Sequence, residues 1–566
     1  MMIFSPEKPK ENWWTKLLSR LLGTKPAIQE SVKESNPFLE RTIENWLNSA
    51  NEMGYLMPFS QLLLSEEFSI CHTSRQNAFE QGKDVVALDK HGSSHAFQLK
   101  GGNITHSRWL KEVKGEIEEL IDLAIEHPSV SKGSKHKSYL VTNGELEDTV
   151  RVAIDNLNSN KWKENPLEVI TYGQLLRGFV ALSNTFVPQK VGNYKTFLDL
   201  YFSNGGGLID ERIFSDFIAD VLRLKEDGLF KEERRRNVAA AVLYTSYILA
   251  PFKKENNHIA IIQILTLLGS HIMAVAEKFS LPEKYWEESF KIIQDEIFLT
   301  GGRLQEEITN DGLVTLVNSM WDGEIGSYRR HLAVSYLFSF KLAQLFEKNT
   351  LWNNAVNDAF FVKLKDSMKL WGEGAIYSLI VCFLYVNRAL SKKEDDRAFS
   401  PLFTALEAVL KFNSPDSKFG LLSPYYGITF AIKRRYGQLE EPLDEKFTGR
   451  SFLIRSLIDL LARHSRRLEL EKYWRAITHI AQDKFIPEEL WQHFTWHCDK
   501  GDNQSEFSNQ TQSWIELVKN ANAIDFDSIP KTIQTHLSFL PLFLLVYPHR
   551  INSNYIKFLD ETVKNA

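Results

Sequence analysis

Cysteine is scarce in this sequence, with three widely separated residues (Cys71, Cys382 and Cys498) among 566. An odd and scattered set gives no disulfide framework, so we expect a protein of the reducing cytoplasm. A surplus of positive charge is missing too, because the formal net charge is −5. That balance argues against a generally basic nucleic-acid-binding surface, although a local basic groove is compatible with it.

Long hydrophobic runs are also missing. The two most apolar windows, Ala375–Val386 and Leu537–Tyr547, fall short of the roughly 18 to 20 residues that a membrane-spanning helix needs. The N-terminus has no apolar core or cleavage site of the secretory kind. We therefore expect no transmembrane segment. The patterns GxxxxGK(S/T) and GxSxG do not occur either, so neither a nucleotide-driven motor nor a serine hydrolase is indicated.

Hydrophobic periodicity divides the chain into four parts. Residues 1–35 combine a short amphipathic helix with a polar linker, and we expect the helix to dock on the protein or a partner, with membrane contact as the alternative. Residues 36–182 mix helical and strand patterns. Residues 183–415 and 416–566 carry apolar residues at helical spacing, with almost no alternating runs and no visible repeat. The pattern predicts an α/β domain followed by a large all-α array.

The α/β part has a distinct order of elements. Residues 37–55 are predicted to form one leading helix that ends at Gly54. Three strands, two helix–strand pairs and a last helix follow, which gives the order α-β-β-β-α-β-α-β-α. A hairpin followed by helix-linked strands predicts a mixed sheet with helices on its faces.

The hairpin formed by strands 83–89 and 94–100 carries the most informative residues. Asp84 opens the first strand, and Gln98 and Lys100 lie near the end of the second. Residues i and i+2 of a strand face the same side, so Gln98 and Lys100 project together, and pairing around the turn brings Asp84 near them. A lysine at the end of an apolar strand is costly to bury without a partner, which indicates a functional reason for it.

Phosphodiester hydrolysis supplies such a reason. A carboxylate and neutral oxygens suit Mg²⁺, or Mn²⁺, which polarises a phosphate and acidifies a bound water. A nearby lysine can orient or deprotonate that water, or stabilise the charge that develops on phosphorus.

The stretch resembles the PD-(D/E)xK nuclease superfamily, and within it the Mrr-like restriction endonucleases that carry QxK instead of ExK. The motifs that carry the resemblance are a helix glutamate before Gly54-Tyr55, the Gly82-Lys83-Asp84 run, the Gln98-Leu99-Lys100 triplet, the Thr-x-Gly at 142–144, and the strand and helix over 169–179. Together they cover about residues 36–180.

The resemblance implies a role for each matching residue. Asp84 is the central metal ligand, Gln98 replaces the second acid, and the carbonyl of Leu99 also coordinates. Lys100 is the catalytic lysine. Glu44 on the leading helix is a further ligand or water-positioning acid, with Glu40 as the competing candidate. Candidate nucleic-acid contacts are Arg108, Lys111, Lys132 and Lys135.

The sequence therefore predicts a metal-dependent endonuclease, acting on DNA rather than RNA, whose helical region senses a trigger, binds a partner protein or drives homo-oligomer assembly. By family analogy, such pairings belong to bacterial restriction and anti-phage defence. Two alternatives stay open. One is an inert nuclease fold that serves as a scaffold, because Gln98 removes an acid from the site, and the other is an RNA-cleaving nuclease.

Histidines offer a weaker alternative site. His493 and His497 lie four residues apart in a predicted helix, a spacing that zinc sites use, but no second ligand pair follows, so a structural role is favoured. His91, His95 and His106 flank the hairpin and are expected to be mostly solvated.

Overall fold

The computed structural model describes residues 37–73, 82–131, 133, 135–184, 191–310, 324–348, 370–390, 396–414, 417, 420–435, 448–497, 501–506 and 512–565. The chain forms two compact units, and each is described by itself. Unit 1 consists of residues 1–202, 220–250 and 283–292, and unit 2 consists of residues 203–219, 251–282 and 293–566. The amphipathic helix expected within residues 1–35 lies outside the described residues.

Unit 1 is built on a five-stranded mixed sheet, which confirms the predicted α/β pattern. Its strands follow one another in chain order, β1-β2-β3-β4-β5. The pairs β1–β2 and β2–β3 are antiparallel, and the pairs β3–β4 and β4–β5 are parallel. The strands are β1 (Ser69–Thr73), β2 (Val85–Leu88), β3 (Ser94–Lys100), β4 (His136–Thr142) and β5 (Leu167–Ile170).

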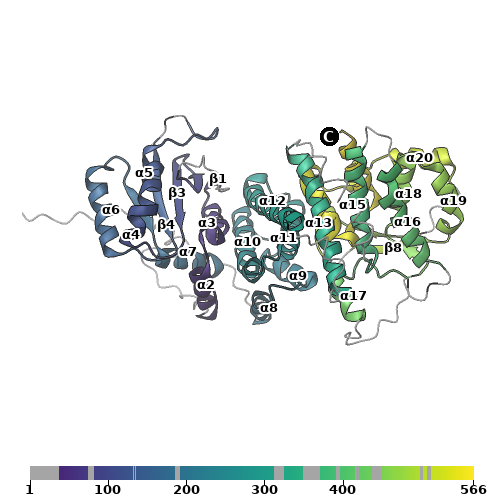
Figure 1. Ribbon diagram of the computed structural model, residues 1–566, viewed down its shortest axis with the longest axis horizontal. Helices are drawn as coiled ribbons and strands as arrows, with labels where there is room; N and C mark the ends of the chain where they lie inside the picture. Colours follow the sequence, from purple (N-terminus) through teal and green to yellow (C-terminus); the bar gives the residue numbers. More distant parts are fainter. Residues whose placement is uncertain are drawn as a thin grey trace, which may run out of the picture. The chain divides into compact units, whose positions relative to one another are not determined.

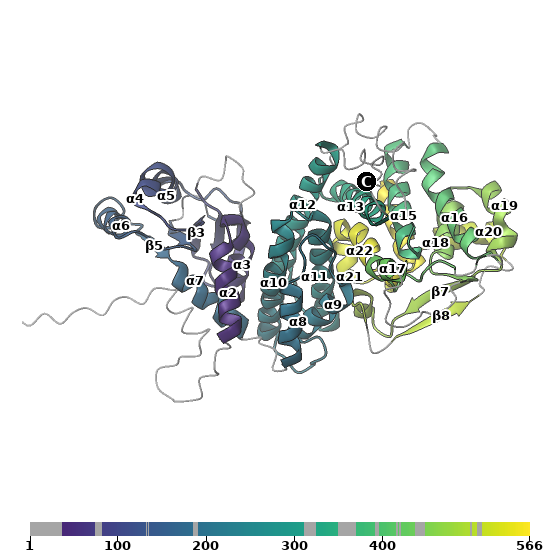
Figure 2. The ribbon, with the colours of Figure 1, turned by 60° about the horizontal axis from the view of Figure 1, so that its bottom comes forward.

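Helices cover both faces of this sheet. Helix α5 (Lys114–Asp122) packs on one face, as Figures 1 and 2 show, together with the preceding short α4 (His106–Arg108), the π-helical turn Trp109–Val113 and α6 (Asp148–Asn160). The opposite face is covered by α2 (Pro37–Ser49), α3 (Glu52–Ser65) and α7 (Tyr172–Asn184). Further helices of unit 1 are α8 (Val191–Tyr201) and parts of α9 (Glu211–Val221), α10 (Lys231–Lys254) and α12 (Glu287–Asn310).

The central strand β3 is buried along its whole length. Its odd-numbered residues face α3, where the Phe59 and Phe97 rings meet edge to face at 5.3 Å. Its even-numbered residues face α5, where Ala96 joins a core with Ile117 and Leu120. Gln98 and Lys100 belong to this second set, so the strand places two polar side chains in line with an apolar core.

The leading helix differs from the prediction, because it is two helices. Helix α2 ends at Ser49, and α3 begins at Glu52. The side chain of Asn51 accepts a hydrogen bond from the backbone N–H of Gly54 at 2.8 Å, which is a helix N-cap. Gly54 therefore lies in the first turn of a new helix rather than at the end of the old one.

Unit 2 is mostly helical. Its main helices are α11 (His258–Lys278), α13 (Glu324–Lys348), α15 (Glu373–Leu390), α16 (Ser400–Phe412), α17 (Ile428–Arg435), α18 (Ile454–Arg463), α19 (Arg467–Ile477), α20 (Trp514–Asn522), α21 (Lys531–Thr535), α22 (Leu540–Val546) and α23 (Ser553–Asn565). Among the described residues, only α11 is long and apolar enough to cross a membrane, and its whole apolar window is buried inside the protein. That burial is typical of a core helix.

The all-α prediction for the C-terminal part is wrong in one place. A three-stranded sheet forms from β6 (Arg450–Ser451), β7 (Ala481–Ile486) and β8 (Asp502–Glu506), in the order β6-β7-β8. Burial alternates strictly along β7, although its sequence, Ala-Gln-Asp-Lys-Phe-Ile, does not alternate apolar and polar residues and so gave no clear strand signal. The polar β8 pairs antiparallel with β7. Most of β8 is exposed, so its sequence has no alternation of apolar and polar residues that would indicate a strand.

The predicted helix around His493 and His497 is also wrong. Only a short 3-10 turn, Leu490–Phe494, is present, and the chain is extended at Thr495. His493 is buried, and its Nδ1 lies 2.8 Å from the carbonyl oxygen of Arg550. The structure gives this histidine a structural partner, as the sequence favoured.

A buried ion cluster holds α18 and α23 together in unit 2. The Nε of Arg463 donates to Asp560 at 2.6 Å, and the side chains of both residues are about 1% exposed. His464 Nε2 and Lys564 Nζ lie 2.8 and 2.9 Å from the same carboxylate. Burial alone would raise the pKa of Asp560, but these cationic partners outweigh it and lower that pKa well below its ordinary value.

Candidate functional site

The hairpin of β2 and β3 brings together the residues that the sequence singled out. Val85 pairs with Phe97 in the antiparallel ladder. The next pair in the same register is Asp84 with Gln98. The backbone N–H of Leu99 donates to Asp84 Oδ2 at 2.6 Å, and the N–H of Asp84 donates to the carbonyl of Phe97 at 2.9 Å. Asp84 is thus fixed against the end of β3 by both its backbone and its side chain.

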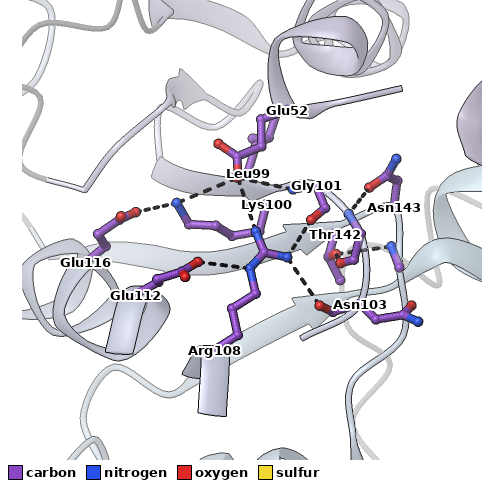
Figure 3. Close-up of polar contacts among 12 residues, drawn as sticks. Glu52, Leu99, Lys100, Gly101, Asn103, Arg108, Glu112, Glu116, Thr142 and Asn143 are labelled. Carbon is purple, nitrogen blue, oxygen red and sulfur yellow. Dashed lines mark hydrogen bonds and ion pairs between the residues drawn. The ribbon is translucent and has the colours of Figure 1, made fainter. Parts of the chain in front are cut away.

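Lys100 lies at the centre of a group of carboxylates (Figure 3). Its Nζ is 2.6 Å from Glu116 Oε2 on α5 and 3.9 Å from Glu52 Oε1 on α3. Glu52 also accepts a hydrogen bond from the N–H of Gly101 at 3.2 Å. The lysine that the sequence predicted to need a partner therefore has two, and both come from helices.

Arg108 is the second cation of the site. It lies 3.7 Å from Glu52 and 3.2 Å from Glu112, and it donates to the carbonyl of Gly101 at 2.5 Å (Figure 3). A cavity of about 400 Å³ opens beside it, lined by Ser49, Ala50, Asn51, Glu52, Met53, Gly101 and Arg108. The cavity gives the edge of the sheet an opening next to Lys100.

The electrostatics of Asp84 set it apart from an ordinary surface acid. Burial raises the pKa of Asp84 from 3.8 to about 6. The Leu99 N–H and the Lys100 ammonium lower that pKa in part, while the negative charges of Glu52 and Glu116 raise it further. The charged form of Asp84 is consequently under-stabilised in this structure.

Gln98 is under-stabilised as well. The side chain is buried, with 4% of its surface exposed, and its Oε1 has no hydrogen-bond partner among the residues that the structure describes. A buried amide oxygen without a donor costs about 1–3 kcal/mol. An unpaired acceptor beside Asp84, on the α5 side of the sheet, is the kind of group that a cation would satisfy.

Tyr55 fixes the backbone of Lys100 from the other face. Its buried hydroxyl accepts from the N–H of Lys100 at 3.1 Å and lies 3.0 and 3.1 Å from the carbonyl oxygens of Lys100 and Val141. Burial raises the pKa of this tyrosine well above its ordinary value, so it stays protonated. The tyrosine of the Gly-Tyr pair therefore joins α3 to β3 and β4 at the point where Lys100 emerges.

The Thr-Asn-Gly run after β4 supports the loop that follows Lys100. Asn143 accepts from the N–H of Gly102 at 2.7 Å, and its Nδ2 donates at 2.7 Å to the carbonyl oxygens of Leu47 and Ala50 at the end of α2. Thr142 Oγ1 donates to the carbonyl of Gly102 at 2.8 Å. Gly144 packs directly on the backbone of Gly102, where any Cβ would collide. This run ties the end of α2 to the loop beside the site.

On the two leading helices, the acid that contacts Lys100 is Glu52, and the two acids that the sequence proposed, Glu44 and Glu40, have no contact with the site among the described residues. Glu44 accepts a hydrogen bond from the hydroxyl of Tyr172 at 3.3 Å, where α7 follows β5. Because β4 lies between β5 and β3, that position is about 10 Å of sheet width from Lys100. Glu40 is exposed on α2. Asn51 followed by Glu52 is an N-cap signal, and it would have predicted a second helix that begins at Glu52.

The basic residues expected to contact nucleic acid divide into two groups. Arg108 lines the site, and Lys111 is exposed on the adjoining turn. Lys135 directly precedes β4. The first residues of β4 and β3 pair with each other, so Lys135 lies at the end of the sheet opposite to Lys100. There it is paired with Glu164 at 2.6 Å. Lys132 lies outside the described residues.

The histidines near the hairpin lie outside the site. The expectation that His95 is solvated is wrong, because it is buried on the α3 side of the sheet, where its Nε2 lies 3.3 Å from Asp89 in the turn. Burial lowers its pKa to about 4, so it is neutral at physiological pH. His91 and His106 are exposed, as the sequence indicated.

The candidate metal site at Asp84 and Gln98 offers few ligands. In the part of the chain that the structure describes, no group of three or more His, Cys, Asp or Glu side chains is arranged to hold a metal. Asp84 Oδ, the unpaired Oε1 of Gln98 and the carbonyl of Leu99 form a set of hard oxygen donors with one negative charge. This set fits Mg²⁺ or Mn²⁺ in kind, and it is one carboxylate short of the usual number.

Comparisons with known proteins add no relative. No family model, no curated protein and no solved structure matches this chain. Any proposal about function therefore rests on the residues of the site.

Proposed function

We propose that this protein is a metal-dependent nuclease that hydrolyses phosphodiester bonds, with DNA as the preferred substrate. One observation carries the proposal. The carboxylate of Asp84, the amide of Gln98 and the ammonium of Lys100 lie at the end of one hairpin, where burial disfavours the charged form of Asp84, Gln98 Oε1 has no partner among the described residues, and Lys100 is paired with Glu116. The resemblance to Mrr-like nucleases supports the same reading.

Charge balance supports a cation at this place. Three carboxylates, those of Asp84, Glu52 and Glu116, face two cations, Lys100 and Arg108. A divalent ion would offset that excess, and it would lower the pKa of Asp84 by favouring its charged form.

Each residue of the site has a role in the proposed reaction. Asp84, Gln98 and the Leu99 carbonyl would hold Mg²⁺ or Mn²⁺, which supplies polarisation of the phosphate and an acidified water when bound. Lys100 orients that water or stabilises the charge that develops on phosphorus. Arg108, beside the cavity, positions the nucleic-acid backbone by contacting a neighbouring phosphate.

The helical remainder of the chain completes the proposal. We infer that it senses a trigger, binds a partner protein or builds a homo-oligomer, as in restriction and anti-phage defence, with the protein in the cytoplasm. Counterion release at a few local basic residues has to provide the grip on DNA, because the chain as a whole is acidic.

An inert scaffold is the second candidate, and the Lys100–Glu116 ion pair favours it. A lysine held permanently at 2.6 Å from a carboxylate is neutralised and cannot act on a phosphate. In that case the residues of the hairpin serve the fold alone, and the protein acts by binding a partner through its helices.

A cleavage assay separates the two candidates. Wild-type protein, Asp84→Ala and Lys100→Ala are incubated with supercoiled plasmid and with total RNA, in Mg²⁺ or Mn²⁺. We expect each substitution to reduce cleavage by at least about 100-fold, in line with the loss of a metal ligand or a general acid–base group.

Lys161→Ala is the matched control, because that exposed lysine pairs with Glu118 at 3.0 Å, is not a candidate nucleic-acid contact and should leave the rate unchanged. A Lys100→Ala protein as active as wild type, or wild type inactive on both substrates, would contradict the nuclease proposal.

A further inference from the structure

The Lys100–Glu116 pair raises a question that the predicted site does not answer. Glu116 Oε2 lies 2.6 Å from Lys100 Nζ, and no other contact of the Glu116 carboxylate is found among the described residues. Its side chain is 41% exposed, so the carboxylate can change rotamer without unpacking the core. A carboxylate with a single partner and room to move is able to exchange that partner.

Glu116 lies on the side of the sheet where a metal would bind. It belongs to α5, which packs against the face formed by the even-numbered residues of β3. That face includes Gln98, whose buried Oε1 has no hydrogen-bond partner. The figure of the site shows Glu116 and Lys100 pointing toward one another from these two elements (Figure 3).

The start of β2 is packed directly on the backbone of Glu116. Gly82 has a positive φ of 68°, and a Cβ there would collide with the carbonyl oxygen of Glu116 and would lie 3.2 Å from the N–H of Leu120. Only glycine permits this approach. Asp84 follows Gly82 by two residues, so this packing holds the chain that leads to Asp84 against the Glu116 turn of α5.

Glu52 is the less suitable acid. It belongs to α3, on the opposite face, and reaches Lys100 only around the end of the strand. The N–H of Gly101 donates to it at 3.2 Å, and Arg108 lies 3.7 Å away, so two other groups already hold its carboxylate. Glu52 is therefore tied in place, whereas Glu116 is tied only to the lysine.

We propose that Glu116 is the second carboxylate of the metal site, replacing the acid that Gln98 does not supply, and that its pairing with Lys100 is the metal-free arrangement. The inference rests on the proposed nuclease function and names one more ligand for it. With a divalent cation bound, Asp84, Gln98 and Glu116 would hold it, and the Glu116 carboxylate would leave the ammonium of Lys100. Lys100 would then be free to face the phosphate.

The exchange explains two features at once. It accounts for a catalytic lysine that is paired with a carboxylate in the structure, and for a metal site that has a single acidic ligand, Asp84, in this arrangement. It also protects the resting protein, because a lysine paired with Glu116 is not aligned on a phosphate until a metal arrives.

Metal binding without substrate tests the inference. Free Mn²⁺ is counted by electron paramagnetic resonance during titration of wild type, Glu116→Gln, Asp84→Asn and the control Glu112→Gln. Glu112 lies one helical turn before Glu116 and pairs with Arg108, with 64% of its side chain exposed. We expect Glu116→Gln to weaken Mn²⁺ binding on the order of tenfold or more and Glu112→Gln to change it less than about twofold.

The outcomes distinguish this inference from the function on which it rests. If wild type binds Mn²⁺ and Asp84→Asn does not, while Glu116→Gln binds as wild type does, Glu116 is no ligand and the nuclease proposal survives. If wild type neither binds Mn²⁺ nor cleaves nucleic acid, both proposals fail. Thermal unfolding of each variant shows whether a loss of binding comes from misfolding.

A second readout follows the lysine itself. A short pulse of an amine-acylating reagent, read by mass spectrometry, reports how accessible Lys100 is, with the exposed Lys111 as an internal reference. We expect Mn²⁺ to increase labelling of Lys100 in wild type several-fold, and Glu116→Gln to show the increase without Mn²⁺. Lys100 labelled equally slowly in wild type with and without bound Mn²⁺ would overturn the exchange of partners.

Discussion

Two buried carboxylates, Asp560 in unit 2 and Asp84 in unit 1, are stabilised in opposite ways. In unit 2, Asp560 is surrounded by Arg463, His464 and Lys564, and its pKa is lowered below the ordinary value. In unit 1, Asp84 has one backbone donor and a lysine that is shared with other acids, and its pKa is raised to about 6. Burial acts to raise the pKa of both carboxylates, so burial alone does not explain the difference.

The difference lies in whether partners are complete. A buried charge that serves the fold is saturated with counter-charges and hydrogen bonds, because any vacancy destabilises the native state. A group that binds a ligand is left short of partners until the ligand comes. Asp84 and the unpaired Gln98 Oε1 show this second pattern, and Asp560 shows the first.

Removal of Asp560 should have the largest effect on stability. Asp560→Ala leaves Arg463 buried without its main counter-charge, which typically costs about 3–5 kcal/mol. We expect urea denaturation to show that loss, and hydrogen exchange to place it in peptides of α18 and α23. An Asp560→Ala protein within about 1 kcal/mol of wild type would show that the cluster is not the structural element described here.

Asp84→Asn should change stability in the opposite direction. A folded pKa of about 6 against an ordinary 3.8 means that the folded state binds more protons than the unfolded state between these values. The stability of the wild-type protein therefore falls by roughly 2 kcal/mol as pH rises from about 4 to 6. The variant shows no such fall, because asparagine does not titrate. Its side-chain oxygen still accepts the hydrogen bond from the Leu99 N–H.

The measurement for Asp84→Asn is hydrogen exchange of β3 peptides at pH 4, 6 and 8 in the presence of a chelator, after correction for the intrinsic exchange rate. We expect the variant to equal wild type at pH 4 and to be more stable by about 2 kcal/mol at pH 8. A variant that is less stable than wild type at pH 8 would place Asp84 in the same class as Asp560.

Gln98→Leu should give the smallest effect. The substitution removes a buried acceptor that has no donor, and it keeps a side chain of similar size, so we expect a gain of about 1 kcal/mol in unit 1. Urea denaturation of wild type and variant, with added Mn²⁺ and without, checks this value. The gain should disappear when Mn²⁺ is added, because only the wild-type protein is then stabilised by bound metal. If the variant is less stable than wild type without metal, the amide of Gln98 has a structural partner.

Local pattern predicted much of unit 1. The hairpin, its register and the shared face of Gln98 and Lys100 follow from alternation around a short turn, and the structure confirms that arrangement. The leading helix was misread because the N-cap of Asn51 restarts a helix within an otherwise continuous apolar pattern. The strand β7 was missed because its partners, β6 and β8, are short or exposed and carry little pattern of their own.

The sequence by itself determined a mixed sheet with Asp84, Gln98 and Lys100 at one end of a hairpin, since period-two alternation and a turn are local properties. Only the tertiary structure decided which acids meet them. Glu52 and Glu116 come from helices on opposite faces of the sheet, separated from each other by 64 residues of chain. Their approach to Lys100 depends on how those helices pack, through Tyr55 on one face and Gly82 on the other, and no local pattern encodes that packing.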